Sequence, residues 1–161
     1  MHRAALFALA LALALPAKAA PLPLAVVTVE GPGVPFGTSE RIDSLVSRLS
    51  DEGLIDARPA RLAVKRLKAC GRSLDRIRCV RAQLRTRPPL ELPLHVAVIA
   101  IPGPGDQVRL TCVGPRRRFR ADPEAEAYVD LAAALSDSPA SATWRARLAR
   151  CLDRAAGERR L

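Results

Sequence analysis

Four cysteines, at positions 70, 79, 112 and 151, constrain the fold more than any other feature of this 161-residue sequence. An even number of cysteines in an exported chain is typical of disulfide bonds, and four cysteines allow three connectivities. Structural zinc sites usually need closely spaced cysteine pairs or added histidines, whereas these cysteines lie 9, 33 and 39 positions apart. A C-x-x-C redox motif is absent from the sequence as well. We therefore predict two disulfide bonds and no metal site.

The stretch between Cys70 and Cys79 predicts that these two cysteines pair. Nine residues of continuous α-helix rotate by about 900° and would place the two side chains on opposite sides. Gly71 and Ser73 indicate a break, because glycine suits the residue after a helix end and serine suits the N-cap of the next helix. Two helices meeting at this corner could bring the sulfurs together, and the disulfide would then lock the corner. Spacing alone leaves the other connectivities open.

The N-terminus predicts export. Met1–Arg3 is short and basic, Ala4–Leu15 is apolar, and Ala17 and Ala19 are small residues at the expected cleavage site. This is the pattern of a cleavable secretory signal over residues 1–19, with an uncleaved anchor as the alternative. The apolar stretch is shorter than the roughly 20 residues that span a bilayer. We expect residues 20–161 to form a single domain, periplasmic or secreted, with a frayed tail at 157–161.

The first half of that domain predicts alternating strands and helices. Residues 24–30 are apolar and β-branched, which indicates a buried strand. Thr38-Ser39 offers a helix N-cap, and the apolar residues that follow recur at helical spacing on one face: Ile42, Leu45, Val46 and Leu49. A short strand over 54–58, a helix over 59–70 and a second helix after Ser73 complete this half.

The second half predicts a hairpin followed by two helices. Residues 92–101 are apolar on both faces, as in a central strand, and 107–113 alternate, as in a half-buried one. Asp122-Pro123 resembles a helix start and leads into a predicted helical face: Ala125, Tyr128, Val129, Ala132 and Leu135. Ser138-Pro139 predicts a last helix with the inner face Trp144, Leu148, Cys151, Leu152 and Ala155.

Together these elements predict an α/β fold with one mixed sheet in the order β-α-β-α-α-β-β-α-α. Cys112 would lie on the inward face of the last strand and Cys151 on the buried face of the last helix. We therefore predict a second disulfide, Cys112–Cys151, that pins the helix to the sheet.

The excess of basic residues has two interpretations, a solvated surface that keeps the protein soluble and attraction to an anionic partner. The chain has 26 basic and 16 acidic side chains, and a net positive charge favours anionic lipid, glycan, nucleic acid or acidic protein. The densest cluster is a candidate anion-binding loop, Arg116, Arg117, Arg118 and Arg120, since guanidinium forks suit phosphate and carboxylate. Its alternative is a solvated loop anchored by Phe119. Arg78, Arg81 and Arg85 form a second stripe. Few aromatic residues argue against nucleic acid.

No catalytic constellation is recognisable. "GPGVPFGTSE" (31–40) lacks the lysine of a phosphate loop, and its prolines remove backbone donors, so we interpret it as a rigid turn. His95 has no assignable nucleophile or orienting acid. The carboxylate pairs Asp51-Glu52 and Glu124/Glu126 fall at predicted helix ends. We expect no enzyme activity and no cofactor.

Several stretches resemble the periplasmic domain shared by the amino-terminal part of TolB, the curli-secretion protein CsgG and lipoprotein activators of penicillin-binding proteins. They are "PLAVVTVEG", "SERIDSLVSRLSDEG", "LIDAR", "CGRSLDRIRC" and "LHVAVIAIPGPGDQVRLTCV", within residues 22–114. The sequence departs from that pattern at "PLELPLHVAVIAIP" and in the two helices predicted after the hairpin. The resemblance implies a non-catalytic protein that binds a protein partner in the bacterial cell envelope. The alternative is a cationic binder of anionic envelope lipid or glycan through the arginine loop.

Overall fold

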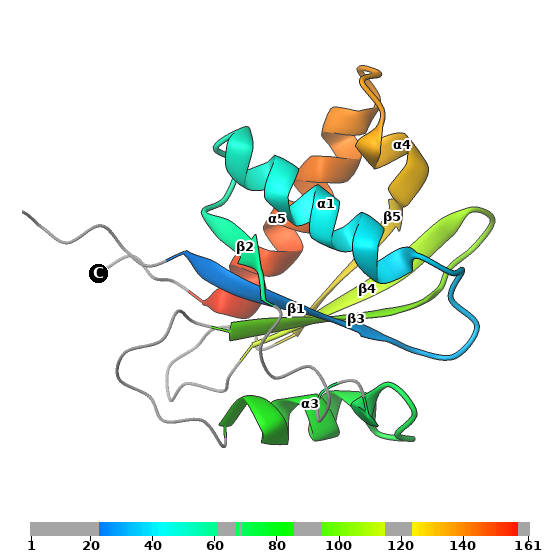
Figure 1. The fold of residues 1–161 in the computed structure, drawn as a ribbon, viewed down its shortest axis with the longest axis vertical. Helices are drawn as coiled ribbons and strands as arrows, with labels where there is room; N and C mark the ends of the chain where they lie inside the picture. The colour runs from blue at the N-terminus through cyan, green and yellow to red at the C-terminus, as the bar shows by residue number, and fades with distance from the viewer. Residues whose placement is uncertain (1–22, 61–66, 68, 86–94, 115–123, 158–161) are drawn as a thin grey trace, which may run out of the picture.

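The computed structural model describes residues 23–60, 67, 69–85, 95–114 and 124–157 (Figure 1). The strands are β1 (Leu24–Glu30), β2 (Ala57–Pro59), β3 (His95–Pro102), β4 (Gln107–Val113) and β5 (Glu124–Asp130). The helices are α1 (Thr38–Asp51), α3 (Arg76–Arg85), α4 (Leu131–Leu135) and α5 (Ser141–Ala156).

The five strands form one mixed sheet in the order β2-β1-β3-β4-β5. β1 is parallel to both β2 and β3, whereas β4 runs antiparallel to both of its neighbours, β3 and β5. Helices α1, α4 and α5 lie on one side of the sheet and α3 on the other (Figure 1). The predicted class, an α/β fold built on a single mixed sheet, is confirmed.

Two apolar clusters, one on each face of the sheet, account for the apolar strands. In β1, Val26 packs in the cluster beneath α1 and α5, whereas Val27 and Val29 pack in the cluster on the α3 side. β3 divides in the same way, with Val98 on the first face and Ile99 on the second. A strand covered on both faces has no solvent side, so its sequence is apolar throughout.

Helix α1 begins differently from the predicted cap. Gly37 precedes it with a positive φ of 78°, and no side chain caps the helix from that position. Thr38 is already helical, and its hydroxyl donates to the Pro35 carbonyl at 2.6 Å. The carboxylate of Glu30, at the end of β1, accepts from the Ser39 N–H at 2.9 Å and from its hydroxyl at 2.8 Å. A carboxylate is favoured at this position by the helix dipole.

The helix predicted after Asp122-Pro123 is wrong over residues 124–130, which form strand β5. Ala125 and Val129 lie four positions apart, a spacing that fits one face of a helix and one face of a strand equally. Pairing with β4 decides for the strand, with Val129 opposite Val108 and Ala125 opposite Cys112. Helix formation starts only at α4, where the Asp130 carboxylate accepts from the Ala133 N–H at 2.9 Å.

The other elements agree with the sequence to within a few residues where the structure describes them. α5 buries Leu148, Cys151, Leu152 and Ala155, as its spacing predicts. The short second strand lies at Ala57–Pro59 rather than 54–58. The helix predicted over 59–70 is wrong at its start, because Pro59 ends β2 and Ala60 continues the pairing with β1 through its N–H, which donates to the Val26 carbonyl at 2.7 Å. Leu67, Ala69 and Cys70 are helical, and residues 61–66 and 68 lie outside the described residues. The predicted signal (1–19), residues 92–94 and the end of the tail (158–161) lie outside the described residues.

Both predicted disulfides are present. Cys70 pairs with Cys79, with Cα atoms 5.5 Å apart, and Cys112 pairs with Cys151, with Cα atoms 5.8 Å apart. The first closes the corner before α3, and the second joins β4 to α5. Disulfides of this kind persist in oxidising compartments outside the cytoplasm. Across the part of the chain that the structure covers, no helix is long and apolar enough to cross a bilayer.

The two disulfides are expected to differ in their contribution to stability. The sequence separations are 39 for Cys112–Cys151 and 9 for Cys70–Cys79. Loop-closure entropy then predicts losses of roughly 4 and roughly 2.7 kcal/mol for the double-alanine variants. Urea unfolding of the oxidised proteins would measure both values, and an equal or reversed order would contradict the prediction.

Helix α5 passes close to the backbone at Gly114, directly after β4. A Cβ atom at this position would lie 1.8 Å from the carbonyl oxygen of Ala155, a backbone atom. We therefore expect Gly114→Ala to lower the free energy of unfolding by about 3 kcal/mol or more, because the helix must move.

Gly53→Ala is the matched control for that substitution. Gly53 has a φ of 69°, and a Cβ atom added there would have no neighbouring atom within 4 Å, so only left-handed strain of about 1 kcal/mol is expected. Denaturant unfolding of both variants checks the difference, and similar losses would contradict the close approach.

Candidate functional site

Helix α5 presents three arginines beside the edge of the sheet. One face of the helix is buried in the core and carries Leu148, Cys151, Leu152 and Ala155. Arg147, Arg150 and Arg154 fall at i, i+3 and i+7 on a neighbouring face, and all three are exposed. This spacing places the three residues in one row along the helix. We refer to them as the arginine row.

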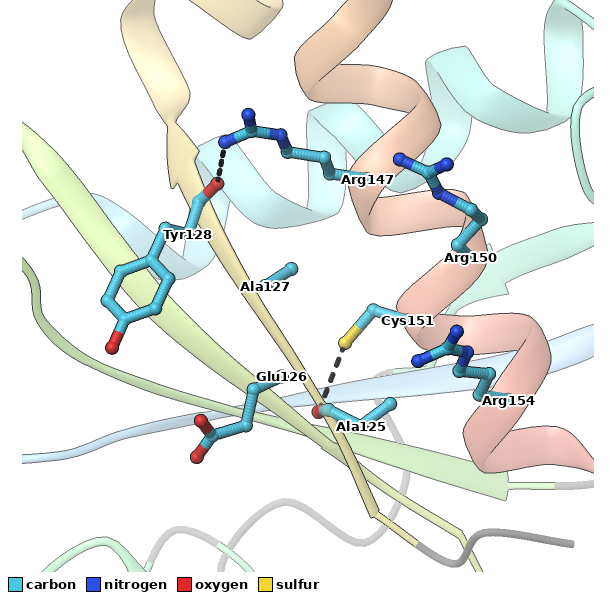
Figure 2. Close-up of a pocket in the computed structure, with 8 residues that line it drawn as sticks. All are labelled: Ala125, Glu126, Ala127, Tyr128, Arg147, Arg150, Cys151 and Arg154. Atoms are coloured by element: carbon cyan, nitrogen blue, oxygen red, sulfur yellow. Dashed lines mark hydrogen bonds between the residues drawn. The ribbon is translucent and has the colours of Figure 1, made fainter.

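The arginine row forms one wall of a groove of about 370 Å³. Strand β5 forms the other wall. Figure 2 shows the Arg147 and Arg154 side chains extending from α5 towards it, with Arg150 between them running along the helix. The groove is lined by Ala125, Glu126, Ala127, Tyr128, Arg147, Arg150, Cys151 and Arg154.

Small and large side chains alternate along β5, and the small ones allow α5 to lie close to the strand. Ala125 and Ala127 face α5 and are buried, and their short side chains leave room for the helix. The sulfur of Cys151 lies 3.3 Å from the Ala125 carbonyl oxygen; because this sulfur is in a disulfide and carries no hydrogen, the contact is packing rather than a donated bond. Glu126 and Tyr128 point away from the arginine row (Figure 2).

Arg147 is held in place by two contacts. Its Nη1 donates to the Tyr128 carbonyl oxygen at 3.4 Å, and its guanidinium carbon lies 4.6 Å from the centre of the Trp144 ring. Arg150 and Arg154 form no hydrogen bond or ion pair with any other described side chain. The groove therefore offers guanidinium donors that are available to an anionic group.

The edge of β5 also offers backbone groups. The Gly103 N–H donates to the Gln107 carbonyl at 2.9 Å, which fixes the hydrogen-bonding phase of the β3–β4 hairpin. Hydrogen-bonded and non-hydrogen-bonded pairs alternate in antiparallel sheets. With the observed registers, Ala125, Ala127 and Val129 therefore face β4. Glu126 and Tyr128 direct their N–H and C=O groups outward, in agreement with the Arg147 bond to Tyr128.

Two other arginines fix the position of α5. Arg145 is mostly buried; its Nε lies 2.9 Å from Glu52 Oε2, and its Nη1 donates to the Ala134 carbonyl at 3.2 Å. Arg48 pairs with Glu52 and with Asp137, and it donates to the Leu135 carbonyl at 2.6 Å. These contacts tie the end of α1, the end of α4 and the start of α5 together.

A second, smaller hollow of about 220 Å³ lies on the α3 side of the sheet. Ile77, Ile99 and Ile101 line it together with Arg109 and the fully exposed Leu74. Its two arginines, Arg76 and Arg109, come from different elements, and Asp75 and Glu126 line it as well.

The structure separates the residues singled out in the sequence. The four cysteines pair as described above. Arg116, Arg117, Arg118 and Arg120 lie outside the described residues. On α3, Arg78 and Arg85 are exposed and Arg81 is partly buried. His95 is half-buried at the start of β3, and Glu52 is engaged by Arg48 and Arg145.

Sequence reasoning missed the arginine row. The signal was present, because the three arginines recur at helical spacing next to the buried residues of α5. The groove could not be inferred while residues 124–130 were interpreted as a helix, since its second wall is a strand.

No protein-family model, curated protein or solved structure matches this chain. Among the described residues, no three histidine, cysteine, aspartate or glutamate side chains are grouped so that they could hold a metal ion. The groove offers guanidinium groups and the backbone of an edge strand, and both kinds of group can bind a ligand.

Arg145 is expected to contribute to stability and Arg147 is not. Arg145→Leu removes the ion pair with Glu52 and leaves the Ala134 carbonyl without its donor, so we expect a loss of about 2 kcal/mol. Arg147→Leu changes an exposed residue and should cost less than about 0.5 kcal/mol. Thermal and urea unfolding of the two variants checks this, and equal losses would show that Arg145 does not fix α5.

Proposed function

We propose that this chain is an exported, non-catalytic domain that binds a protein partner in the bacterial cell envelope through the groove between α5 and β5. The observation that carries the proposal is the arginine row, because its three guanidinium groups line one groove together with the edge strand β5 (Figure 2). Cations next to unpaired backbone groups suit a peptide ligand, because such a ligand supplies both carboxylates and backbone partners.

Three further observations support this proposal. The signal-like N-terminus and the two disulfides fit an oxidising compartment outside the cytoplasm. The resemblance of the sequence to the TolB and CsgG type of domain points to the same compartment. Within the groove, the carboxylate of Glu126 lies across β5 from the arginine row (Figure 2), so acid and cations do not converge on one reacting atom.

The second candidate function is binding of anionic envelope lipid or glycan through Arg116, Arg117, Arg118 and Arg120. One observation favours it. The described residues that flank this segment adjoin the same end of the groove, since Gly114 contacts Ala155 and Ala125 contacts Cys151. Binding of this kind should fall steeply with salt. It should also be lost in the four-alanine loop variant and retained in Arg147→Ala/Arg150→Ala/Arg154→Ala.

The proposal predicts that the arginine row is needed for capture of a specific partner. Immobilised, oxidised protein (residues 20–161) would be incubated with envelope extract of the source bacterium and eluted with salt and then with denaturant. We expect one stoichiometric protein, reduced about tenfold with Arg147→Ala/Arg150→Ala/Arg154→Ala, since exposed charge pairs each contribute up to about 1 kcal/mol.

The matched control is Arg72→Ala/Arg78→Ala/Arg85→Ala. These arginines are also exposed, lie at or before α3 on the other side of the sheet (Figure 1), and carry the same charge. Capture should be unchanged in this variant. If both variants lose partner capture to the same extent, net charge alone explains the loss, and this result would contradict a role for the groove.

A further inference from the structure

We infer that the ligand of the groove is an extended acidic segment that pairs with β5 as an antiparallel sixth strand. This inference rests on the proposed function and specifies the chemistry and conformation of the partner. Edge strands with unpaired backbone groups are natural sites for strand addition.

Within the described part of the chain, β5 pairs with β4 on one side and leaves its other side open to a further strand. β5 is seven residues long and forms one end of the sheet. Glu126 and Tyr128 direct their N–H and C=O groups away from β4, as the hairpin phase requires. Among the described residues, the Tyr128 carbonyl accepts only the 3.4 Å bond from Arg147. An incoming backbone N–H can replace this long bond and release the Arg147 guanidinium for a carboxylate.

The arginine row specifies the side chains of the added strand. Residues directly opposite each other in an antiparallel pair share a face, so residues opposite Ala125, Ala127 and Val129 would extend towards α5. The row from Arg147 to Arg154 covers about 10 Å along the helix, and three alternate strand residues cover about 13 Å. Acidic residues at alternate positions therefore match the row. The intervening side chains would lie beside Glu126 and Tyr128.

Charge also argues against a second copy of this chain as the occupant. Pairing of two β5 edges around a two-fold axis would bring two arginine rows together, and like charges repel. The arginine row then has two consequences: it discourages self-association at this edge, and it attracts an acidic strand.

The test uses a nine-residue peptide in which glutamates alternate with threonine and valine, and fluorescence anisotropy to measure its dissociation constant with the oxidised protein. Two N-methylated forms carry the same charge. Methyl groups on the threonine and valine nitrogens block the N–H groups that face β5 in an antiparallel pair, whereas methyl groups on the glutamate nitrogens face away. We expect the first form to bind at least about tenfold more weakly and the second to retain most of the affinity.

Variants of the protein also distinguish backbone pairing from charge attraction. Glu126→Pro removes an outward N–H without breaking the pairing with β4, and proline is tolerated at such edge positions. It should weaken binding at least about tenfold, although the protein becomes more cationic. Glu126→Ala, with the same charge as the proline variant, should not weaken binding, and circular dichroism verifies that both variants fold.

The outcomes separate the inference from the proposed function. If neither methylated form loses affinity but Arg147→Ala/Arg150→Ala/Arg154→Ala does, the groove binds acidic ligands without strand pairing and the inference is wrong. Loss only on methylation of the glutamate nitrogens would also contradict the antiparallel arrangement. If the peptide does not bind and partner capture is insensitive to the arginine row, the proposed function fails as well. If the protein dimerises and Glu126→Pro abolishes the dimer, the occupant of the β5 edge is a second copy of this chain and the inferred acidic segment is wrong.

Discussion

The packing of α5 against strands β4 and β5 is the interaction on which the rest of the structure depends. The Cys112–Cys151 disulfide joins the helix to β4, and Leu148, Leu152 and Ala155 bury the same helical face in the larger apolar cluster. The approach is close enough that the position facing Ala155 must be a glycine, Gly114. Because the helix is fixed in this way, the exposed side chains next to its buried face have a defined position relative to the edge of the sheet.

The composition of β5 follows from the same packing. Its inward positions carry alanine at 125 and 127, which lets α5 approach, and its outward-facing positions carry Glu126 and Tyr128. An exposed edge strand with small side chains invites uncontrolled pairing, and cations beside it are a known protection. In the proposed account, the arginine row would fulfil that role against copies of the same chain, and the acidic partner would use the same charges for recognition. Helix α5 would then contribute both to the stability of the fold and to the choice of partner at the β5 edge.

Much of the fold could be predicted from local sequence. The helical spacing of Ile42, Leu45 and Leu49 indicates one face of a helix. The short apolar runs of β1 and β3 indicate buried strands because they are rich in β-branched residues and end at glycine and proline. Both disulfides could be predicted as well, since Gly71 and Ser73 mark the corner and Cys112 and Cys151 fall on faces that must meet. The spacing of Ala125 and Val129 fits helix and strand alike, so only long-range pairing with β4 could decide. The candidate site was out of reach for the same reason, because a groove at a sheet edge depends on which strand ends the sheet.

Amide hydrogen exchange across residues 124–130 of the free, oxidised protein tests the central claim most directly. If β5 is an edge strand clamped beneath α5, the amides of Ala125, Ala127 and Val129 are protected by β4, and those of Glu126 and Tyr128 exchange rapidly. Alternating protection of this kind is the predicted result. Continuous protection through the segment would indicate a helix or a covered edge, and it would contradict both the groove and the binding surface derived from it.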